Sequence, residues 1–283
     1  EVDELYSQIN YQDQPVRVSP LKYASVIKWF TNMREGIPAY IKIDMATQNT
    51  ELVKLSEGMK YTTSDHFNRN IYRHLRFNYP TYIFNDLSFE IDEDGVPYWI
   101  CPVKKYNIGL FGGTTIGRVV LCNAITGETK DYAVEDVPQW VDRVYSADLL
   151  VELYNYHGTL KHGFFNSVLG QKDCLNTTDG YNYLAIDDDV WVYTGVTSIT
   201  GDQSNVGFVL MNQRTMETKF YEIEGATESS AMSSAEGQVQ NLHYTATFPL
   251  LLNISGEPTY FIALKDDAGL VKKYAMVNVQ KYQ

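Results

Sequence analysis

The sequence contains little cysteine and no long apolar run. Only three of its 283 residues are cysteines, and an odd number outside any Cys-X-X-Cys pair cannot form a closed disulfide framework. We therefore expect small, buried thiols at Cys101, Cys122 and Cys174. No stretch of about 18 apolar residues occurs, so no segment of this sequence is expected to cross a membrane as a helix.

Motifs for catalysis and for cofactor binding are also missing. The five histidines form no His-Glu-X-X-His zinc motif, and neither a Gly-X-Ser-X-Gly nucleophile elbow nor a phosphate-binding loop ending in Gly-Lys-Ser/Thr is present. The sequence therefore predicts no catalytic residue, no metal ligand and no cofactor. A hydrolase that uses two carboxylates stays open as an alternative, because such pairs meet only in the folded chain and 35 acidic residues are available.

Positive charge is scarce as well. The chain has 23 Lys and Arg residues against 35 Asp and Glu, a formal net charge of −12, and its basic residues are dispersed except for short pairs. Such a chain would repel a phosphate backbone, so nucleic acid is not expected as a partner. The first residue is Glu1 rather than Met, which is compatible with a signal or membrane anchor removed ahead of it. We expect membrane contact only through such an anchor.

Aromatic residues are abundant. The 22 tyrosines, 12 phenylalanines and four tryptophans favour half-buried sheet faces over long helices, which argues against an all-helical protein. A chain of this length also exceeds the usual size of one hydrophobic core, so two or three packed units are expected.

One ten-residue pattern occurs three times. Residues 123–132 (NAITGETKDY) and 212–221 (NQRTMETKFY) are nearly the same, and residues 44–53 (DMATQNTELV) form a third copy. In each copy a polar turn follows a strand-like run and precedes further β-branched or aromatic residues. The pattern predicts three antiparallel β-hairpins.

A helix is predicted after each hairpin, opened by residues that cap helices well. These helices are expected over 66–77 after the cap candidates at 62–65, over 137–154 after Asp136, and from 228 after Thr227. A further helix is expected near the start, with Ser19 as its cap and Pro20 in its first turn. Its apolar face, expected to pack on the first hairpin, consists of Tyr23, Val26, Ile27 and Phe30.

A second kind of hairpin precedes the first in the later part of the chain, at 87–103, 183–196 and 251–264. The predicted fold class is therefore α+β, built from repeated antiparallel hairpin and helix units whose sheets are covered on one face by helices. We expect a first unit over 1–83, a second over 84–182 that includes the loop 159–182, and a third over 183–283 that ends in a partial repeat.

The segment Val120 to Tyr132, with Thr126-Gly127-Glu128 in its turn, resembles the PepSY domain, a small module of bacterial secreted and membrane proteins. In peptidase propeptides that module acts as a chaperone or inhibitor. Longer segments, including 79–99, 137–150 and 187–198, look similar to an uncharacterised family of membrane-anchored proteins of Gram-positive bacteria. These resemblances imply an extracytoplasmic position behind an N-terminal anchor, and they imply no catalytic residue.

Two segments are weak candidates for binding. Asp187, Asp188 and Asp189 are adjacent carboxylates, which repel unless they are solvated, paired or bound to a cation. An acidic turn is the favoured interpretation, because an oxygen-ligand metal site needs six or more ligands. The loop 159–182 is long and contains Phe164 and Phe165. Both rings are expected to plug the seam between two units, and a partner-binding loop is the alternative.

The function expected from these features is binding or regulation rather than catalysis. The chain is predicted to be an extracytoplasmic, PepSY-like module that binds a protein or another cell-envelope component through sheet faces and loops. The alternative is a cell-envelope hydrolase with a carboxylate site between repeat units. Two acids with opposed pKa shifts in a deep cleft would favour the hydrolase.

Overall fold

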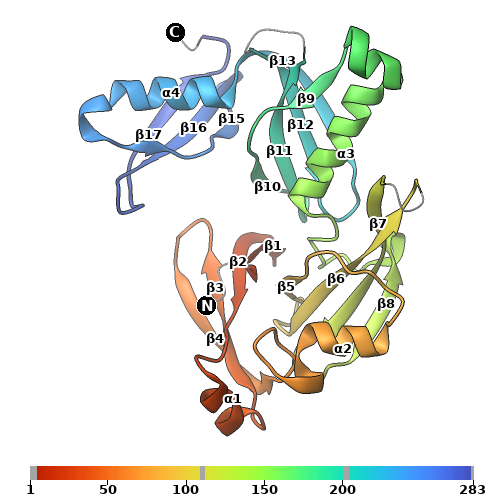
Figure 1. Cartoon of the computed structure of the whole chain (residues 1–283). Coiled ribbons are helices and arrows are strands. Elements are labelled where there is room, and N and C mark those ends of the chain that lie inside the picture. Colours follow the sequence, from red (N-terminus) through yellow and green to blue (C-terminus); the bar gives the residue numbers. More distant parts are fainter. Residues whose placement is uncertain (1–4, 109–111, 200–203, 282–283) are drawn as a thin grey trace. The chain divides into compact units, whose positions relative to one another are not determined.

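The structure is a computed structural model that describes residues 5–108, 112–199 and 204–281 (Figure 1). Over these residues the chain forms four antiparallel sheets with short helices between and beside them, so the predicted α+β class is confirmed. No helix in the described part is long and apolar enough to cross a membrane.

The chain divides into two compact units. Unit 1 comprises Glu1–Ser146, Ala185–Val190 and Gln213–Met216, and unit 2 comprises Ala147–Leu184, Trp191–Asn212 and Glu217–Gln283. The three-part division expected from the sequence stays a prediction.

Unit 1 holds two four-stranded sheets, each with its strands in chain order. The first sheet consists of β1 (Ser7–Tyr11), β2 (Gln14–Pro20), β3 (Ile37–Asp44) and β4 (Thr50–Met59). The second consists of β5 (Ser88–Ile91), β6 (Pro97–Tyr106), β7 (Thr114–Asn123) and β8 (Thr129–Ala133). The helices are α1 (Val26–Asn32) and α2 (Ile71–Asn78), with 3-10 turns η2 (Phe67–Arg69) and η4 (Val134–Asp136).

Aromatic side chains join the two sheets of unit 1 into one core. Phe89 of β5 lies edge-on to Trp99 of β6, with ring centroids 5.4 Å apart, and 6.0 Å from Tyr40 of β3. The Trp99 indole donates a hydrogen bond of 2.8 Å to the Tyr61 carbonyl. Cys101 and Cys122 are buried in this unit and Cys174 in unit 2, all as free thiols, which confirms the expected buried cysteines.

Unit 2 holds the other two sheets, except for the end of β10 and the start of β11, which fall in unit 1. One consists of β9 (Leu175–Thr177), β10 (Asn182–Ile186), β11 (Asp189–Ser198), β12 (Ser204–Asn212) and β13 (Thr218–Ala226). The other consists of β14 (Thr245–Ala246), β15 (Leu250–Ile254), β16 (Glu257–Lys265) and β17 (Val271–Asn278). The helical segments are α3 (Ala147–Leu160), η5 (Asn166–Gly170), α4 (Glu228–Gln238) and η6 (Gln240–Leu242). Ala231 and Ala235 of α4 share a core with Phe208 and Tyr260, because small side chains let the helix lie close to the strands.

The three predicted hairpins are confirmed as β3–β4, β7–β8 and β12–β13, and their turns share one geometry. In each turn the first residue donates its N–H to the carbonyl of the sixth, with distances of 2.9, 2.9 and 2.8 Å for Asp44 to Asn49, Asn123 to Glu128 and Asn212 to Glu217. The fifth residue is left-handed in every case, with φ of 61° at Gln48, 76° at Gly127 and 65° at Met216. The repeated ten residues therefore encode the same turn three times.

The helices that follow the hairpins agree less well with the sequence. Thr227 caps α4 as predicted, its side chain accepting from Ser230 N–H at 3.2 Å. The first helix of the three is shorter than expected, since it begins at Ile71 with Asn70 as its cap. The second, expected over 137–154, begins only at Ala147.

The late start of α3 has a hydrogen-bonding cause. The N–H groups of Val144 and Tyr145 donate to the Gln213 carbonyl at 3.1 and 2.8 Å, and those of Asp142 and Arg143 donate to the Glu90 carboxylate. Backbone groups used in this way cannot make the i to i−4 bonds of a helix, so residues 137–146 stay non-helical.

The N-terminal prediction was wrong in its details. Ser19 and Pro20 end strand β2, and α1 begins at Val26 after Ser25, whose hydroxyl accepts from Lys28 N–H at 3.3 Å. The hairpin β1–β2 ahead of it was missed, because its turn residues, Gln12 and Asp13, both adopt positive φ without a glycine. In α1 only Trp29 is buried. Of the expected apolar face, Val26, Ile27 and Phe30 are exposed and Tyr23, ahead of the helix, is half-buried.

The hairpin turns allow a matched test of backbone strain. A Cβ added to Gly127 would lie 2.3 Å from the Tyr61 ring, and a left-handed φ adds strain, so Gly127→Ala should lower the free energy of unfolding by about 2–3 kcal/mol. Gln48→Gly at the equivalent exposed position should leave stability unchanged or raise it by up to about 1 kcal/mol. Urea denaturation measures the free energy of unfolding of both variants. An equal loss for Gly127→Ala and Gln48→Gly would contradict the shared turn geometry.

Candidate functional site

Residues 161–174, which follow α3, fold back on that helix and are held there by hydrogen bonds on their inner side. The Asn166 side chain holds them, because its amide donates to the Lys172 carbonyl at 2.9 Å and to the sulfur of buried Cys174 at 3.4 Å. The Cys174 thiol in turn donates to the Thr159 carbonyl at 3.4 Å. Residues 160–174 are thereby tied to the end of α3 by polar groups on their inner side.

Strand β9 brings the chain back along α3. The Asn155 amide donates to Thr177 Oγ1 at 3.1 Å, and Thr177 N–H donates to Asn155 Oδ1 at 2.8 Å. A Cβ at Gly158 would lie 2.3 Å from the Leu175 carbonyl oxygen, so this position of the helix has room only for glycine. Helix α3 and β9 therefore pack as one body within unit 2.

An open groove of about 680 Å³ runs along α3. Residues from successive turns of the helix form one wall, and the segment after it closes the end; the lining residues are Asp148, Val151, Glu152, Asn155, Tyr156, Thr159, Leu160, Phe164, Ser167 and Asn176. Its two carboxylates already accept tyrosine hydroxyls, Asp148 from Tyr181 at 3.1 Å and Glu152 from Tyr156 at 2.8 Å.

Apolar side chains around this groove face solvent. Phe164 is 69% and Phe165 78% exposed, their rings 6.0 Å apart, so the expected plug between two units was wrong. The reason is that the polar groups of Asn166 and Cys174 take the inner positions of the segment and leave the rings outside. We call the exposed set the 160s cluster; it comprises Leu160, Phe164, Phe165, Val168 and Leu169.

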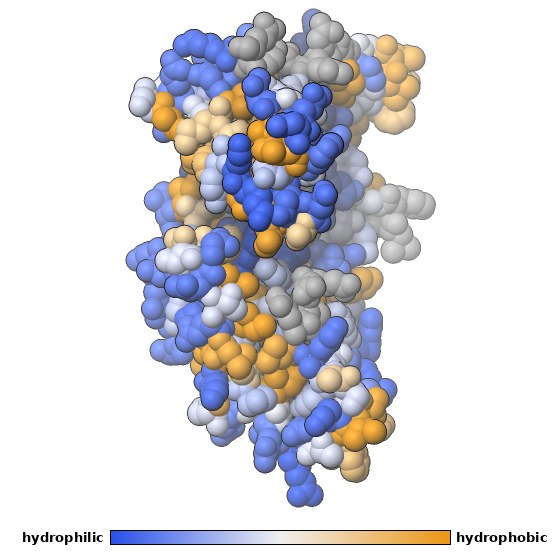
Figure 2. All heavy atoms as spheres, turned by 90° about the vertical axis from the view of Figure 1, so that its left-hand side faces the viewer, coloured by the Kyte–Doolittle hydropathy of each residue, from blue (hydrophilic) through white to orange (hydrophobic). Residues whose placement is uncertain are grey.

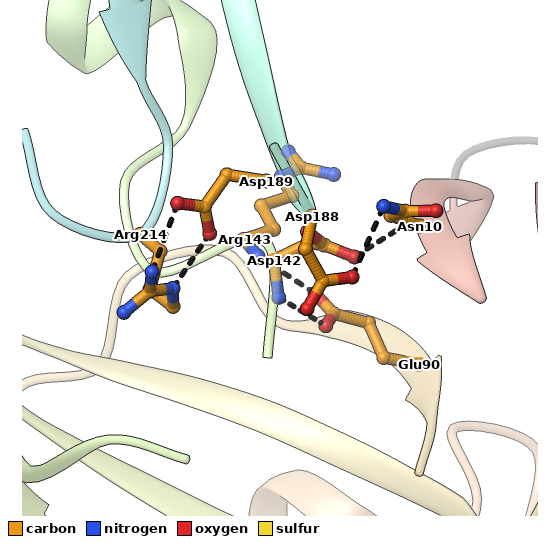
Figure 3. A network of polar contacts seen from close by, with 7 residues as sticks. All are labelled: Asn10, Glu90, Asp142, Arg143, Asp188, Asp189 and Arg214. Atoms are coloured by element: carbon orange, nitrogen blue, oxygen red, sulfur yellow. Dashed lines mark hydrogen bonds and ion pairs between the residues drawn. The ribbon is translucent and has the colours of Figure 1, made fainter. Parts of the chain in front are cut away.

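The three aspartates of the predicted acidic turn belong to unit 1, not to the unit that holds the groove. Asp187 and Asp188 form the two-residue turn between β10 and β11, with φ of 50° and 65°. Asp189 makes a bidentate ion pair with Arg214 at 2.7 and 2.8 Å, and Asp188 Oδ1 accepts from the Asn10 amide at 3.1 Å (Figure 3). At least two of the three carboxylates are therefore occupied by protein donors.

Two further carboxylates, which the sequence did not reveal, belong to the same network (Figure 3). Glu90 of β5 accepts backbone N–H bonds from Asp142 at 2.9 Å and Arg143 at 3.0 Å. Asp142 Oδ2 accepts from Asn10 N–H at 2.7 Å, while its Oδ1 has no hydrogen-bond partner among the described residues. Their side chains are buried, at 0% and 1% exposure.

The environment of this pair shifts both pKa values in one direction. Burial raises the pKa of Glu90 to about 7, and the two backbone donors offset only part of that rise. Burial, and after it the nearby Glu90 carboxylate, raises the pKa of Asp142 well above its usual range. The pair is thus a buried polar junction that resists ionisation.

Metal binding is not suggested by this geometry. Within the described ranges, no three His, Cys, Asp or Glu side chains are grouped so that they could hold an ion together. The expectation that the protein binds no metal or cofactor stays a prediction, which metal analysis of the purified protein would test.

The sequence contained one signal for the missed residues. Glu90 interrupts the apolar run Leu87-Ser-Phe-Glu-Ile91, and a charged residue inside such a strand is unusual. Glu228, buried at the start of α4 in unit 2, gave no comparable signal, because acidic residues are common in the first turn of a helix. It accepts from Thr178 Oγ1 at 2.9 Å, and burial raises its pKa.

Removal of one buried carboxyl should change how stability depends on pH. The folded-state pKa values of Glu90 and Asp142 lie above the unfolded values, so the folded chain keeps protons that the unfolded chain has released. Stability is therefore lost as the pH rises from about 4 toward 7 and beyond. Asp142→Asn keeps the acceptor for Asn10 N–H, and it should lose less stability than the wild type between pH 5 and 8, by roughly 1–3 kcal/mol.

Urea denaturation at both pH values measures this difference. Asp267→Asn, in an exposed turn, is the matched control and should follow the wild-type curve. Identical pH dependence of Asp142→Asn and the wild type would contradict the buried-pair interpretation.

The exposure of the 160s cluster makes a second stability prediction. Phe165→Ala should change the free energy of unfolding by less than about 1 kcal/mol, because the ring contributes little to the core. Phe208→Ala in the same unit, where the ring is 1% exposed, should cost roughly 3–5 kcal/mol. A loss of that size for Phe165→Ala would instead support burial of the ring between two units.

No protein-family model matches this chain, and no curated protein matches it. Its function is therefore inferred from the residues and their geometry.

Proposed function

We propose that this chain is a non-enzymatic binding or regulatory module of the bacterial cell envelope, positioned outside the cytoplasm. Its binding site is the groove along α3 together with the 160s cluster. The observation that carries this proposal is the set of five apolar side chains, 45–82% exposed, of which Leu160 and Phe164 line a groove of about 680 Å³. Contiguous exposed apolar side chains with a polar rim are typical of surfaces that bind other proteins.

A PepSY-like repeat is part of the same proposal. The three hairpins with one turn geometry, each followed in the chain by a helix, support it, and so does the succession of two hairpins and a helix in β5–β8 with α3 and β10–β13 with α4. The extracytoplasmic position rests on the resemblance to membrane-anchored envelope proteins. PepSY-like modules of peptidase propeptides bind proteins, which agrees with the kind of partner proposed.

The lining of the groove indicates the chemistry of the partner. Phe164 and Leu160 offer apolar contact near one end, and aromatic anchors of this kind dominate the energy of many interfaces. The carboxylates of Asp148 and Glu152 lie along the helix and favour a basic group on the partner. The expected partner segment therefore combines two or three large apolar side chains with a Lys or Arg.

Exposed apolar residues elsewhere provide the control. Figure 2 shows apolar side chains gathered in separate patches among hydrophilic ones on the face that it presents. Tyr274 and Met276 of β17 are each 64% exposed and lie in the same unit as the groove. They match the 160s cluster in exposure without sharing its groove.

A displayed peptide library, selected on the whole protein, tests the proposal. Peptides with apolar residues beside Lys or Arg should be enriched, and the double variant Phe164→Ser/Phe165→Ser should bind them at least about tenfold more weakly, a difference of about 1.4 kcal/mol. The double variant Tyr274→Ser/Met276→Ser should bind them normally. No enrichment, or equal binding by both variants, would count against the groove as the site.

The alternative, a cell-envelope hydrolase, finds less support. A pair of acids in hydrolysis needs access to substrate and opposed pKa shifts, so that one is a proton donor while the other is ionised. Glu90 and Asp142 are buried, and burial raises the pKa of both. Hydrolysis of envelope glycans by the wild type that Asp142→Asn abolished would favour the alternative.

A further inference from the structure

A second exposed apolar cluster lies at one end of unit 1, where α1 projects from the first sheet (Figure 1). Val26, Ile27 and Phe30 of α1 are 62%, 75% and 68% exposed, and Phe67 of η2 is 69% exposed. We call these four residues the α1 tip. All four side chains are therefore accessible to a partner surface.

The α1 tip is mounted on a fixed base. Trp29, the buried residue of α1, donates from its indole N–H to Asp65 Oδ1 at 3.0 Å, and Asp65 Oδ2 accepts from Thr62 Oγ1 at 2.7 Å. The Trp29 ring lies 4.6 Å from that of His66, and the Arg69 guanidinium donates to the Met33 carbonyl at the end of the helix. The four apolar side chains therefore project from an ordered platform.

One member of the tip is held in a strained conformation. Phe67 has a φ of 56°, in the left-handed region, which a bulky residue without a special reason seldom occupies. Its ring still faces solvent and does not enter the core. Backbone strain at a residue whose ring lies outside the core is typical of a functional contact, because it does not serve core packing.

The charge around the tip is opposite to that of the chain as a whole. Residues 20–36 and 60–78, which build the tip and its base, contain seven Lys and Arg against two Asp and Glu, whereas the whole chain has 23 against 35. Lys22, Lys28 and Arg34 are exposed, and none of them makes an ion pair with any residue in the described ranges. One of the two acids, Asp65, is buried beneath Trp29.

We propose that the α1 tip docks onto the surface of a lipid bilayer that contains anionic lipids. Its apolar side chains would enter the boundary between headgroups and acyl chains, while the lysines and arginines around them meet the lipid phosphates. Projecting aliphatic and aromatic residues surrounded by Lys and Arg are the combination that interfacial membrane binding requires. This surface is distinct from the groove along α3 and does not depend on the function proposed for it.

Vesicle flotation tests the proposal with the whole protein. The wild type should float with vesicles of equal parts phosphatidylcholine and phosphatidylglycerol, should not float with phosphatidylcholine alone, and should be released as the salt concentration rises toward about 0.5 M. Ile27→Ser/Phe30→Ser should lower the partition coefficient at least about tenfold, and Lys22→Glu/Lys28→Glu/Arg34→Glu should abolish binding.

Two controls keep the result specific. Phe164→Ser/Phe165→Ser removes equally exposed rings from unit 2 and should float like the wild type. Thermal unfolding of the tip variants should match the wild type, because the hydrogen bonds of Trp29 with Asp65 and of Arg69 with Met33 are unchanged.

Three outcomes would overturn the proposal. They are failure of the wild type to bind anionic vesicles at low salt, equal binding to neutral vesicles, and binding that Ile27→Ser/Phe30→Ser leaves unchanged. Sedimentation equilibrium separates a further case, in which the wild type binds no vesicles but self-associates through the tip. Loss of that association in the tip variant would assign the tip to contact between copies of the chain.

Discussion

The buried carboxylate of Glu90 determines how the chain leaves the second sheet. It occupies the N–H groups of Asp142 and Arg143, so the residues after β8 cannot turn at once into a helix. Burial of a carboxylate costs free energy unless hydrogen-bond donors compensate for the lost water. For Glu90 the donors are backbone N–H groups of the segment after β8, which is thereby held against the second sheet. The start of α3 at Ala147 follows from that constraint.

Local features of the fold were predictable from the sequence, and non-local ones were not. The three hairpin turns depend on residues within ten positions of one another, such as Asn123 and Gly127, so their pattern was visible in the sequence. The start of α3 depends on Glu90 and Gln213, some 50 to 70 residues distant in the chain, and periodicity carries no information about such partners. The same limit explains the exposed Phe164 and Phe165, because two aromatics in sequence look alike whether they face a core or solvent.

The two exposed apolar clusters differ in the charge around them. Two carboxylates line the groove along α3, whereas the segments that build the α1 tip and its base are rich in Lys and Arg. On a chain with a net charge of −12, a locally basic surface is unusual and selects an anionic counterpart. The two proposed surfaces, one in each unit, therefore call for counterparts of opposite charge.

The buried cysteines also make the protein convenient for spectroscopy. Cys101 and Cys122 lie in the core of unit 1, where burial raises the pKa of both thiols, and Cys174 is enclosed beneath the segment after α3. Thiol reagents act on the exposed thiolate, so a cysteine introduced at an exposed site would be labelled selectively in the otherwise native chain. A single fluorophore or spin label could thus report on either surface without removal of any natural thiol.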